Sequence, residues 1–158
     1  MKQLIIAISS LFICRIGIAQ SEIGVVKVFT PKREILDKDK ISVDVIFYPG
    51  DSKNISVLEN PVFSDFDSEI SGIQFRIDRL VDSCFSVIYV TTDFFSLDID
   101  TSKVKLKNND PVVYHYNISN IYSFRKNQYR MKVFFIYFIG KEFKIAESKW
   151  QYFSVIDQ

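Results

Sequence analysis

YRMKVFFIYFIGKEFKIAE, residues 129–147, is the most regular part of this sequence. Its first half places an apolar side chain at every second position, which is the period of a β-strand with one buried face. The inward set is expected to be Tyr129, Met131, Val133, Phe135 and Tyr137. Gly140 and Lys141 then separate two β-rich runs, a spacing that predicts a two-residue hairpin with a type II′ turn. We therefore expect an antiparallel pair whose second strand runs from Glu142 to about Ile156.

This hairpin would place apolar side chains on its outer face. With Gly140 and Lys141 at the turn, Phe138 lies opposite Phe143, Ile136 opposite Ile145, and Phe134 opposite Glu147. A monomer rarely leaves such a patch uncovered, so the hypothesis is self-association or docking of an envelope or extracellular protein. The alternative is a β-bulge near Val133, or a covering loop, that hides these side chains. The predicted patch consists of Phe134, Ile136, Phe138, Phe143 and Ile145.

The rest of the chain repeats the same two-residue period. Ile41, Val43, Val45 and Phe47 alternate with less apolar positions, and further short β-rich runs occur at 23–30, 55–58, 73–77, 84–92 and 112–118. Turn signals separate them, and no run shows a helical period. The sequence predicts an all-β, antiparallel sandwich of seven to nine strands, formed as one domain by residues 20–158.

Residues 121–133 resemble the corner before the penultimate strand of immunoglobulin-like domains. Phe124, Asn127 and Tyr129 match the apolar residue, the turn residue and the tyrosine of that corner. The resemblance implies that Tyr129 is buried with its hydroxyl bonded to nearby backbone, and that Asn127 has a positive φ. Met131 stands where antibody-type domains carry a cysteine, so the resemblance implies the broader immunoglobulin-like β-sandwich class.

The end of the chain carries a second likeness. Residues 148–155, SKWQYFSV, are similar to the last strand of small exported immunoglobulin-like proteins of uncharacterised role from Gram-negative bacteria. The leader that ends in Ala19-Gln20 is similar to theirs too. The likeness concerns the fold and carries no catalytic residue to this chain.

Residues 1–19 are expected to be a signal peptide. Lys2 precedes the apolar run 4–13, and small residues stand before Gln20. About 20 apolar residues are needed to cross a bilayer, so this run is too short for a transmembrane anchor. The prediction is a periplasmic or secreted protein. A lipoprotein signal at Cys14 is the less favoured alternative, because Ile13 stands where a small residue is expected.

Charge and cysteine content limit the function. The net charge of +1 lacks the basic excess that nucleic-acid binding requires. Cys84 is the only cysteine beyond the leader and is expected to be buried. His115 is the only histidine, so a Cys84–His115 pair is the one route to a hydrolase, and zinc lacks a ligand set. We expect a non-enzymatic protein without a cofactor.

Three charged segments have alternative explanations. Asp65, Asp67 and Glu69 alternate and could offer oxygen ligands to calcium, although the loop lacks calcium-loop spacing, which favours a solvated acidic loop. Asp98 and Asp100 are interpreted in the same way. The lysines at 103, 105 and 107 are typical of an edge strand protected from pairing, with an anionic glycan or lipid patch as the alternative.

The rival function is a protease inhibitor. A small exported sandwich can present a loop to a protease cleft, and the turns at 49–54 or 108–111 would then insert. The favoured hypothesis is a binding or accessory module that acts through its loops or through the 134–145 hairpin.

Overall fold

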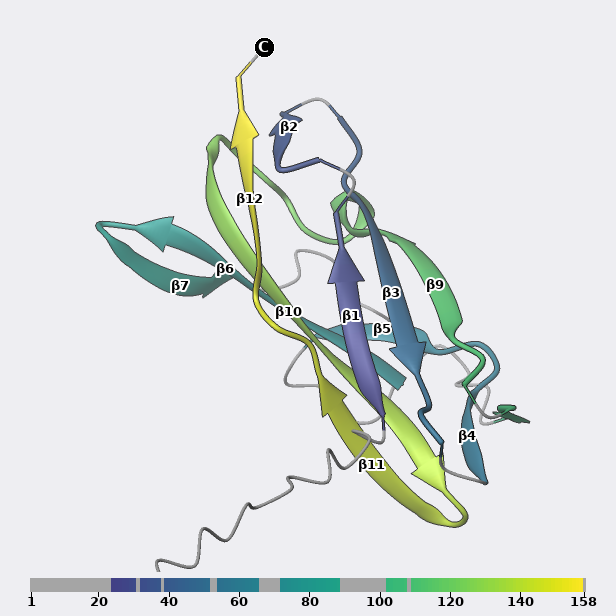
Figure 1. Ribbon diagram of the computed structural model, residues 1–158. Helices are drawn as coiled ribbons and strands as arrows, with labels where there is room; N and C mark the ends of the chain where they lie inside the picture. Colours follow the sequence, from purple (N-terminus) through teal and green to yellow (C-terminus); the bar gives the residue numbers. More distant parts are fainter. Residues whose placement is uncertain are drawn as a thin grey trace, which may run out of the picture.

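The computed structural model shows an all-β protein built from two packed sheets (Figure 1). It describes residues 24–30, 32–37, 39–51, 54–65, 72–88, 102–107 and 109–157. The leader at 1–19 lies outside these ranges. No helix among these residues is long and apolar enough to cross a membrane. In chain order the elements are β1 (Val25–Phe29), β2 (Glu34–Leu36), β3 (Ser42–Tyr48), β4 (Ile55–Leu58), β5 (Val62–Asp65), β6 (Gly72–Val81), β7 (Cys84–Ile88), β8 (Lys103–Lys105), β9 (Val112–Asn117), the 3₁₀ turn η1 (Ile118–Asn120), β10 (Asn127–Ile139), β11 (Glu142–Glu147) and β12 (Gln151–Ile156).

The smaller sheet has the order β1-β3-β9 and is antiparallel throughout. Its central strand β3 follows the predicted alternation, because Val43, Val45 and Phe47 are fully buried and the residues between them are not. Ile41, just before the strand, is also buried. The period of two therefore placed the inner face of this sheet correctly.

The larger sheet is organised around the long strand β10. One edge of β10 pairs with β6 and then with β4, and the other edge pairs with β12 and then with β11. The strands β2, β5, β7 and β8 extend its margins. Pairing is antiparallel except for β12 with β2 and β5 with β6. The expected antiparallel sandwich is confirmed, with these two parallel pairs at its margins.

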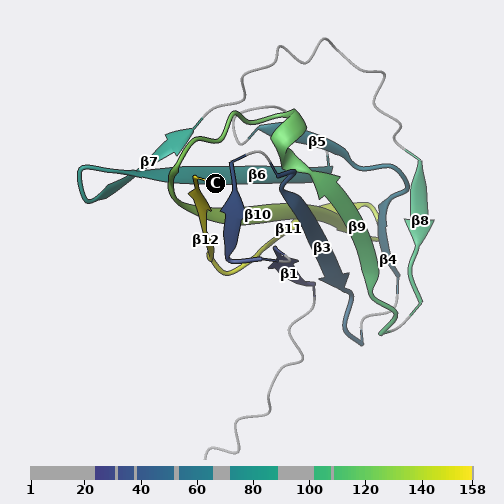
Figure 2. The same ribbon diagram turned by 90° about the horizontal axis from the view of Figure 1, so that it is seen from above.

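Aromatic rings fill the space between the two sheets, and in the view from above β3 and β9 of the smaller sheet cross over β6 and β10 of the larger (Figure 2). Phe47 of the smaller sheet stacks on Phe135 of the larger, with ring centroids 4.6 Å apart, and contacts Tyr137 at 5.0 Å. Each buried aromatic removes about 150–250 Å² of surface from water, so a few of them make a large part of the core.

The hairpin register follows the prediction. Phe138 pairs with Phe143, Ile136 with Ile145, and Phe134 with Glu147. Gly140 has φ +63, the positive angle that the first position of a type II′ turn requires, and a Cβ there would meet nothing within 4 Å. The turn therefore selects glycine for its backbone angle and not for space.

A β-bulge separates β11 from β12. Phe134 pairs with Glu147, whereas Met131 pairs with Gln151, so three residues of the last strand oppose two residues of β10. The bulge covers residues 148–150 and lies opposite Val133. A bulge near Val133 was one of the alternatives, but it lies in the last strand and leaves the β11 side chains facing outward.

The corner around Tyr129 has the expected hydroxyl geometry. Tyr129 is buried, its hydroxyl donates to the Arg125 carbonyl at 2.7 Å, and the Arg125 N–H donates back to it at 3.0 Å. Phe124 packs on the Tyr129 ring edge-to-face at 5.2 Å. Asn127 differs from the expectation, because it begins β10 and has no positive φ. The Tyr129 hydroxyl therefore closes the corner, and Asn127 does not adopt the left-handed conformation.

The β6–β7 hairpin lay outside the sequence prediction. Its two turn residues, Asp82 and Ser83, both have positive φ, as a type I′ turn requires. Neither asparagine nor glycine marks this turn, so the sequence pattern indicated only two separate runs. The hairpin carries Cys84 out to the margin of the larger sheet.

Candidate functional site

The outer face of the larger sheet carries the predicted patch, which we call the hairpin patch: Phe134, Ile136, Phe138, Phe143 and Ile145. Phe143 is 61% exposed and Ile145 is 54% exposed. Phe134 and Phe138 are half-buried. Ile136 is only 5% exposed, which differs from the expectation that all five side chains lie outside. The exposed part of the patch therefore centres on β11.

Lys103 covers one side of the hairpin patch. Its Nζ atom lies 3.5 Å from the centroid of the Phe138 ring, close enough for a cation–π contact. Lys103 belongs to the short strand β8, which pairs only with β4 among the described strands. This position at the margin of the sheet fits the edge-strand explanation for the lysines at 103, 105 and 107. The contact of Lys103 with the Phe138 ring depends on tertiary packing, which the spacing of the lysines in the sequence could not reveal.

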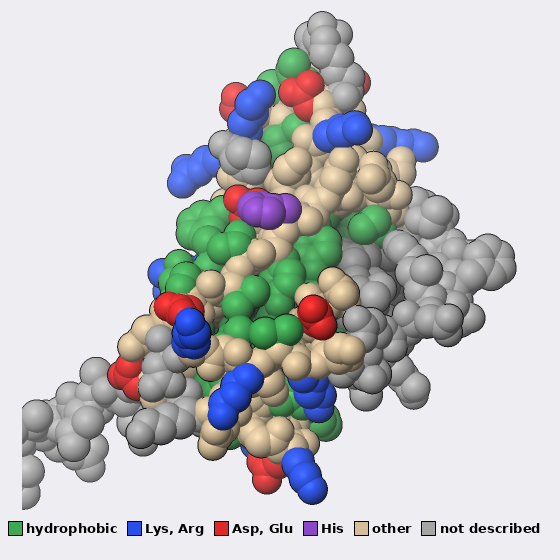
Figure 3. All heavy atoms as spheres, turned by 90° about the vertical axis from the view of Figure 1, so that its right-hand side faces the viewer, with side chains coloured by type: hydrophobic (Ala, Val, Ile, Leu, Met, Phe, Trp, Pro, Cys, Tyr) green, Lys and Arg blue, Asp and Glu red, His purple; other side chains and the backbone are tan. Residues whose placement is uncertain are grey.

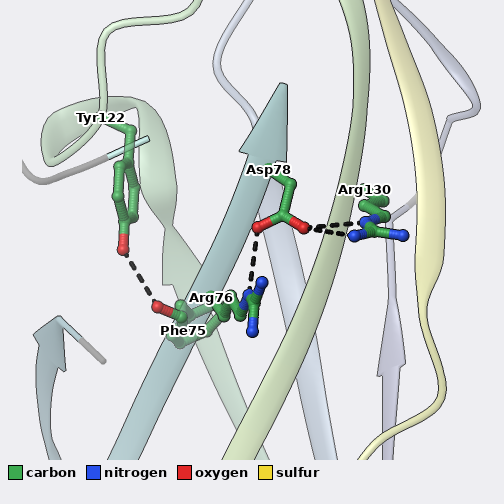
Figure 4. A network of polar contacts seen from close by, with 5 residues as sticks. All are labelled: Phe75, Arg76, Asp78, Tyr122 and Arg130. Carbon is green, nitrogen blue, oxygen red and sulfur yellow. Dashed lines mark hydrogen bonds and ion pairs between the residues drawn. The ribbon is translucent and has the colours of Figure 1, made fainter. Parts of the chain in front are cut away.

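A second cluster lies on the same outer face, toward the other end of β10. We call it the cation plate: Arg76, Asp78, Arg130, Lys132 and Trp150. Asp78 is completely buried; its Oδ2 accepts from Arg130 Nε at 2.8 Å and Nη2 at 2.7 Å, and its Oδ1 accepts from Arg76 Nε at 3.2 Å (Figure 4). A buried carboxylate needs such partners, because desolvation without them costs several kcal/mol.

The bulge brings Trp150 over this cluster. The Arg130 guanidinium lies 4.2 Å from its ring centroid, Lys132 Nζ lies 5.4 Å away, and the Arg76 guanidinium 5.6 Å. Arg130 also lies 4.5 Å from the Phe85 ring, so it is held between two aromatic side chains. These contacts form a surface of closely packed cationic and aromatic side chains.

The cation plate was missed by sequence reasoning. Asp78 was assigned to a wet face because it follows the alternation of Ile73, Phe75 and Ile77, and it does point away from the core. Its burial comes from Arg130 on the neighbouring strand, directly opposite in the register. The only signal in the sequence was an acid two residues after the outward-facing Arg76, and it becomes informative once the pairing of Asp78 with Arg130 is known.

Cys84 and His115 are not brought together. Cys84 lies on β7 and His115 on β9, which stand on opposite sides of the molecule in both ribbon views (Figures 1 and 2). Cys84 is exposed, so the expectation of a buried thiol is wrong. The ring Nδ1 of His115 lies 2.7 Å from Oδ1 of Asp44 on the adjacent strand. The geometry thus separates the one nucleophile–base pair that the sequence offered.

The outer face of the smaller sheet is mixed in character. The histidine lies beside an acidic side chain and next to a field of hydrophobic side chains (Figure 3). Phe29 is 49% exposed and Val113 is 44% exposed on this sheet. Both fractions are below those of Phe143 and Ile145 on β11, although apolar side chains also gather on this face.

The two turns considered for protease inhibition brace each other. The Asn109 side-chain amide donates to Asp51 at 2.7 Å, and the Asn109 N–H donates to the Gly50 carbonyl at 3.3 Å. Asn54 and Asn109 both have positive φ. The turns therefore form one joined structure at the end of the smaller sheet.

The structure offers no metal centre in its described ranges, where no group of three or more His, Cys, Asp or Glu side chains could hold an ion. Asp65 ends β5, but its side chain is not described. Asp67, Glu69, Asp98 and Asp100 lie outside the described residues, so the calcium hypothesis stays a prediction.

Comparison of the sequence with models of known protein families finds no match, and a search of curated proteins finds no significant relative.

Proposed function

We propose that this protein is an exported, non-enzymatic binding or accessory module that docks on another envelope or extracellular protein through the hairpin patch. One observation carries the proposal: Phe143 and Ile145 are each more than half exposed and occupy the same face of β11. Burial of apolar surface contributes about 25 cal/mol per Å², so covering two such side chains supplies useful binding energy.

The charges around the patch indicate the chemistry of its partner. Lys105 and Lys141 are exposed, and neither forms an ion pair with any described residue. The nearby acids Glu142 and Glu147 are paired with Lys144 and Lys132 at 3.0 Å each. A protein surface with an apolar centre and an acidic rim would complement this arrangement.

The non-enzymatic part of the proposal is supported by the separation of Cys84 from His115. Export is proposed on the apolar leader alone. The mass of the protein recovered from an envelope or culture fraction would test it, with a new terminus at Gln20 expected.

Site-specific photo-crosslinking tests the docking surface. A photoreactive phenylalanine analogue at position 143 should give a discrete adduct in the native envelope, and Ile145→Asp should suppress that adduct. The same analogue at Val113, an exposed position on the other sheet, is the matched control. An adduct of twice the chain mass would assign the patch to self-association. Equal adducts at both positions, or none at 143, would refute the proposal.

One observation favours the inhibitor hypothesis: Asn109 braces the turn at residues 49–51. A loop that is already held in one conformation loses less conformational entropy when it binds. A panel of extracellular proteases assayed with the purified protein tests it. If the protein inhibits a protease and Asn109→Ala weakens that inhibition, the inhibitor hypothesis is supported. If the protein inhibits no protease of the panel, the hypothesis is refuted.

A further inference from the structure

A groove of about 530 Å³ runs along the free side of β1. One wall consists of all five residues of β1, and the other belongs to the bulged part of the last strand. The groove therefore lies where the two sheets of the sandwich meet, on the far side of the last strand from β10. Its lining residues on that second wall are Glu147, Lys149, Trp150 and Gln151.

Both walls are edges of strands. Within the described ranges β1 pairs only with β3, so alternate N–H and C=O groups of β1 point toward the groove. On the other wall, β2 pairs with residues 154–156 of the last strand and stops short of residues 149–151. An extended segment in this groove would find backbone partners along β1 and contacts with the bulge on its other side.

The side chains of β1 alternate in a way that suits an added strand. Val26 and Val28 are 3% and 6% exposed and face the sandwich interior, whereas Lys27 and Phe29 are exposed on the outer side. An added strand would continue this alternation, with apolar side chains inward and polar ones outward.

Lys27 determines what kind of strand fits. It stands at the centre of the five-residue edge, so in the centred antiparallel pairing of two copies of β1, Lys27 would face itself, and like charges directly opposite are destabilising. Lys27 and Lys149 are both exposed and form no ion pair with any residue in the described ranges. An acidic side chain opposite Lys27 on the incoming strand would offset its charge, and Lys149 stands on the other wall of the groove.

We propose that this groove binds an extended peptide segment of a partner protein, which adds to β1 as a strand and places an acidic side chain beside Lys27. The Glu147 carboxylate also lines the groove, but its negative charge is offset by the Lys132 ammonium 3.0 Å away. The proposal concerns a different surface from the hairpin patch and does not depend on it.

The test uses two synthetic nonapeptides with alternating valine and threonine that differ only at the central outward position, aspartate in one and lysine in the other. The purified protein should bind the aspartate peptide about tenfold more tightly, in line with one opposite-charge pair exchanged for one like-charge pair. Lys27→Glu should invert this preference. Lys107→Glu, at an exposed position just after β8, should leave it unchanged.

Hydrogen exchange locates the binding. Amides of residues 25–29 should gain protection with the aspartate peptide, and those of the 142–147 strand should not. Equal affinity for the two peptides, a preference that Lys27→Glu leaves in place, or protection away from β1 would overturn the proposal. None of these outcomes bears on the adduct at position 143, so the two surfaces are judged separately.

Discussion

Ser148 and Val133 exchange two hydrogen bonds across the bulge. The Ser148 N–H donates to the Val133 carbonyl at 2.9 Å, and the Val133 N–H donates to the Ser148 hydroxyl oxygen at 2.9 Å. The serine side chain thus replaces the backbone partner that the bulge removes. Because the bulge adds one residue, odd positions face outward before it, as at Ile145, and even positions after it, as at Tyr152.

Ser148→Ala should lower the free energy of unfolding by about 1–3 kcal/mol, because it leaves the buried Val133 N–H without an acceptor. Urea denaturation followed by tryptophan fluorescence measures this change, since Trp150 belongs to the bulge. Ser86→Ala, at an exposed position on β7, is the control and should change stability little. Equal effects of the two substitutions would contradict the role given to Ser148.

Arg130→Met should destabilise the protein more than Arg76→Met. Arg130 makes two short contacts with the buried Asp78 carboxylate and Arg76 makes one longer contact, so we expect losses of about 3 and about 1 kcal/mol. Denaturant titrations of both variants measure the difference. In an Asp78→Asn background the gap between them should shrink, and a gap that persists there would assign it to packing alone.

The two-residue period predicted much of this fold. It identified the inner face of β3 and the register of Phe138 with Phe143, because both depend on local alternation and one glycine turn. It did not predict the burial of Asp78 or the contact of Lys103 with Phe138, because each depends on which distant strand becomes the neighbour.

Backbone irregularities were the other source of error. The Asp82-Ser83 turn lacks the asparagine or glycine that usually marks a two-residue hairpin, so the β6–β7 hairpin and the exposure of Cys84 were missed. The hairpin patch was predicted as five outward side chains, and the structure leaves Phe143 and Ile145 largely exposed while it buries Ile136. Sequence parity gives the face of a side chain, but not what covers that face.

Cys84 should react with a thiol reagent in the folded protein. Its side chain is exposed near the β6–β7 turn, so Ellman's reagent should modify it without denaturant. Mass spectrometry of the peptide that contains Cys84 identifies the modified site, and Cys84→Ser should abolish that signal. Modification that requires urea would restore the buried thiol expected from the sequence.

Tyr129→Phe should cost about 1–2 kcal/mol of stability while leaving the fold intact. The substitution removes both hydrogen bonds to Arg125 but keeps the ring that stacks on Phe153, with centroids 5.3 Å apart. Tyr122→Phe is the matched comparison, because its hydroxyl donates to the Phe75 carbonyl at the longer distance of 3.3 Å (Figure 4). Thermal unfolding should show the larger shift for Tyr129→Phe, and the reverse order would contradict the corner geometry.

Two tyrosines of β9 should make the protein less stable at alkaline pH. The Tyr114 hydroxyl donates to the Leu58 carbonyl at 3.3 Å, and the Tyr116 hydroxyl donates to the Pro61 carbonyl at 3.1 Å, which ties the smaller sheet to the end of β4. Burial raises the pKa of Tyr114 to about 12. Burial, and then the charge of Tyr114, raises the pKa of Tyr116 above its ordinary value of 10.

Because the folded state holds these phenolic protons more tightly than the unfolded state, their stabilisation is complete below pH 10 and is lost as pH rises from 10 toward 12. Urea titrations at pH 8, 9, 10 and 11 should therefore give a constant free energy of unfolding at first and a falling one above pH 10. Replacing both Tyr114 and Tyr116 by phenylalanine should flatten that fall, whereas Tyr152→Phe, at a position 54% exposed, should not. A decline of the same steepness in the double variant would show that other groups cause it.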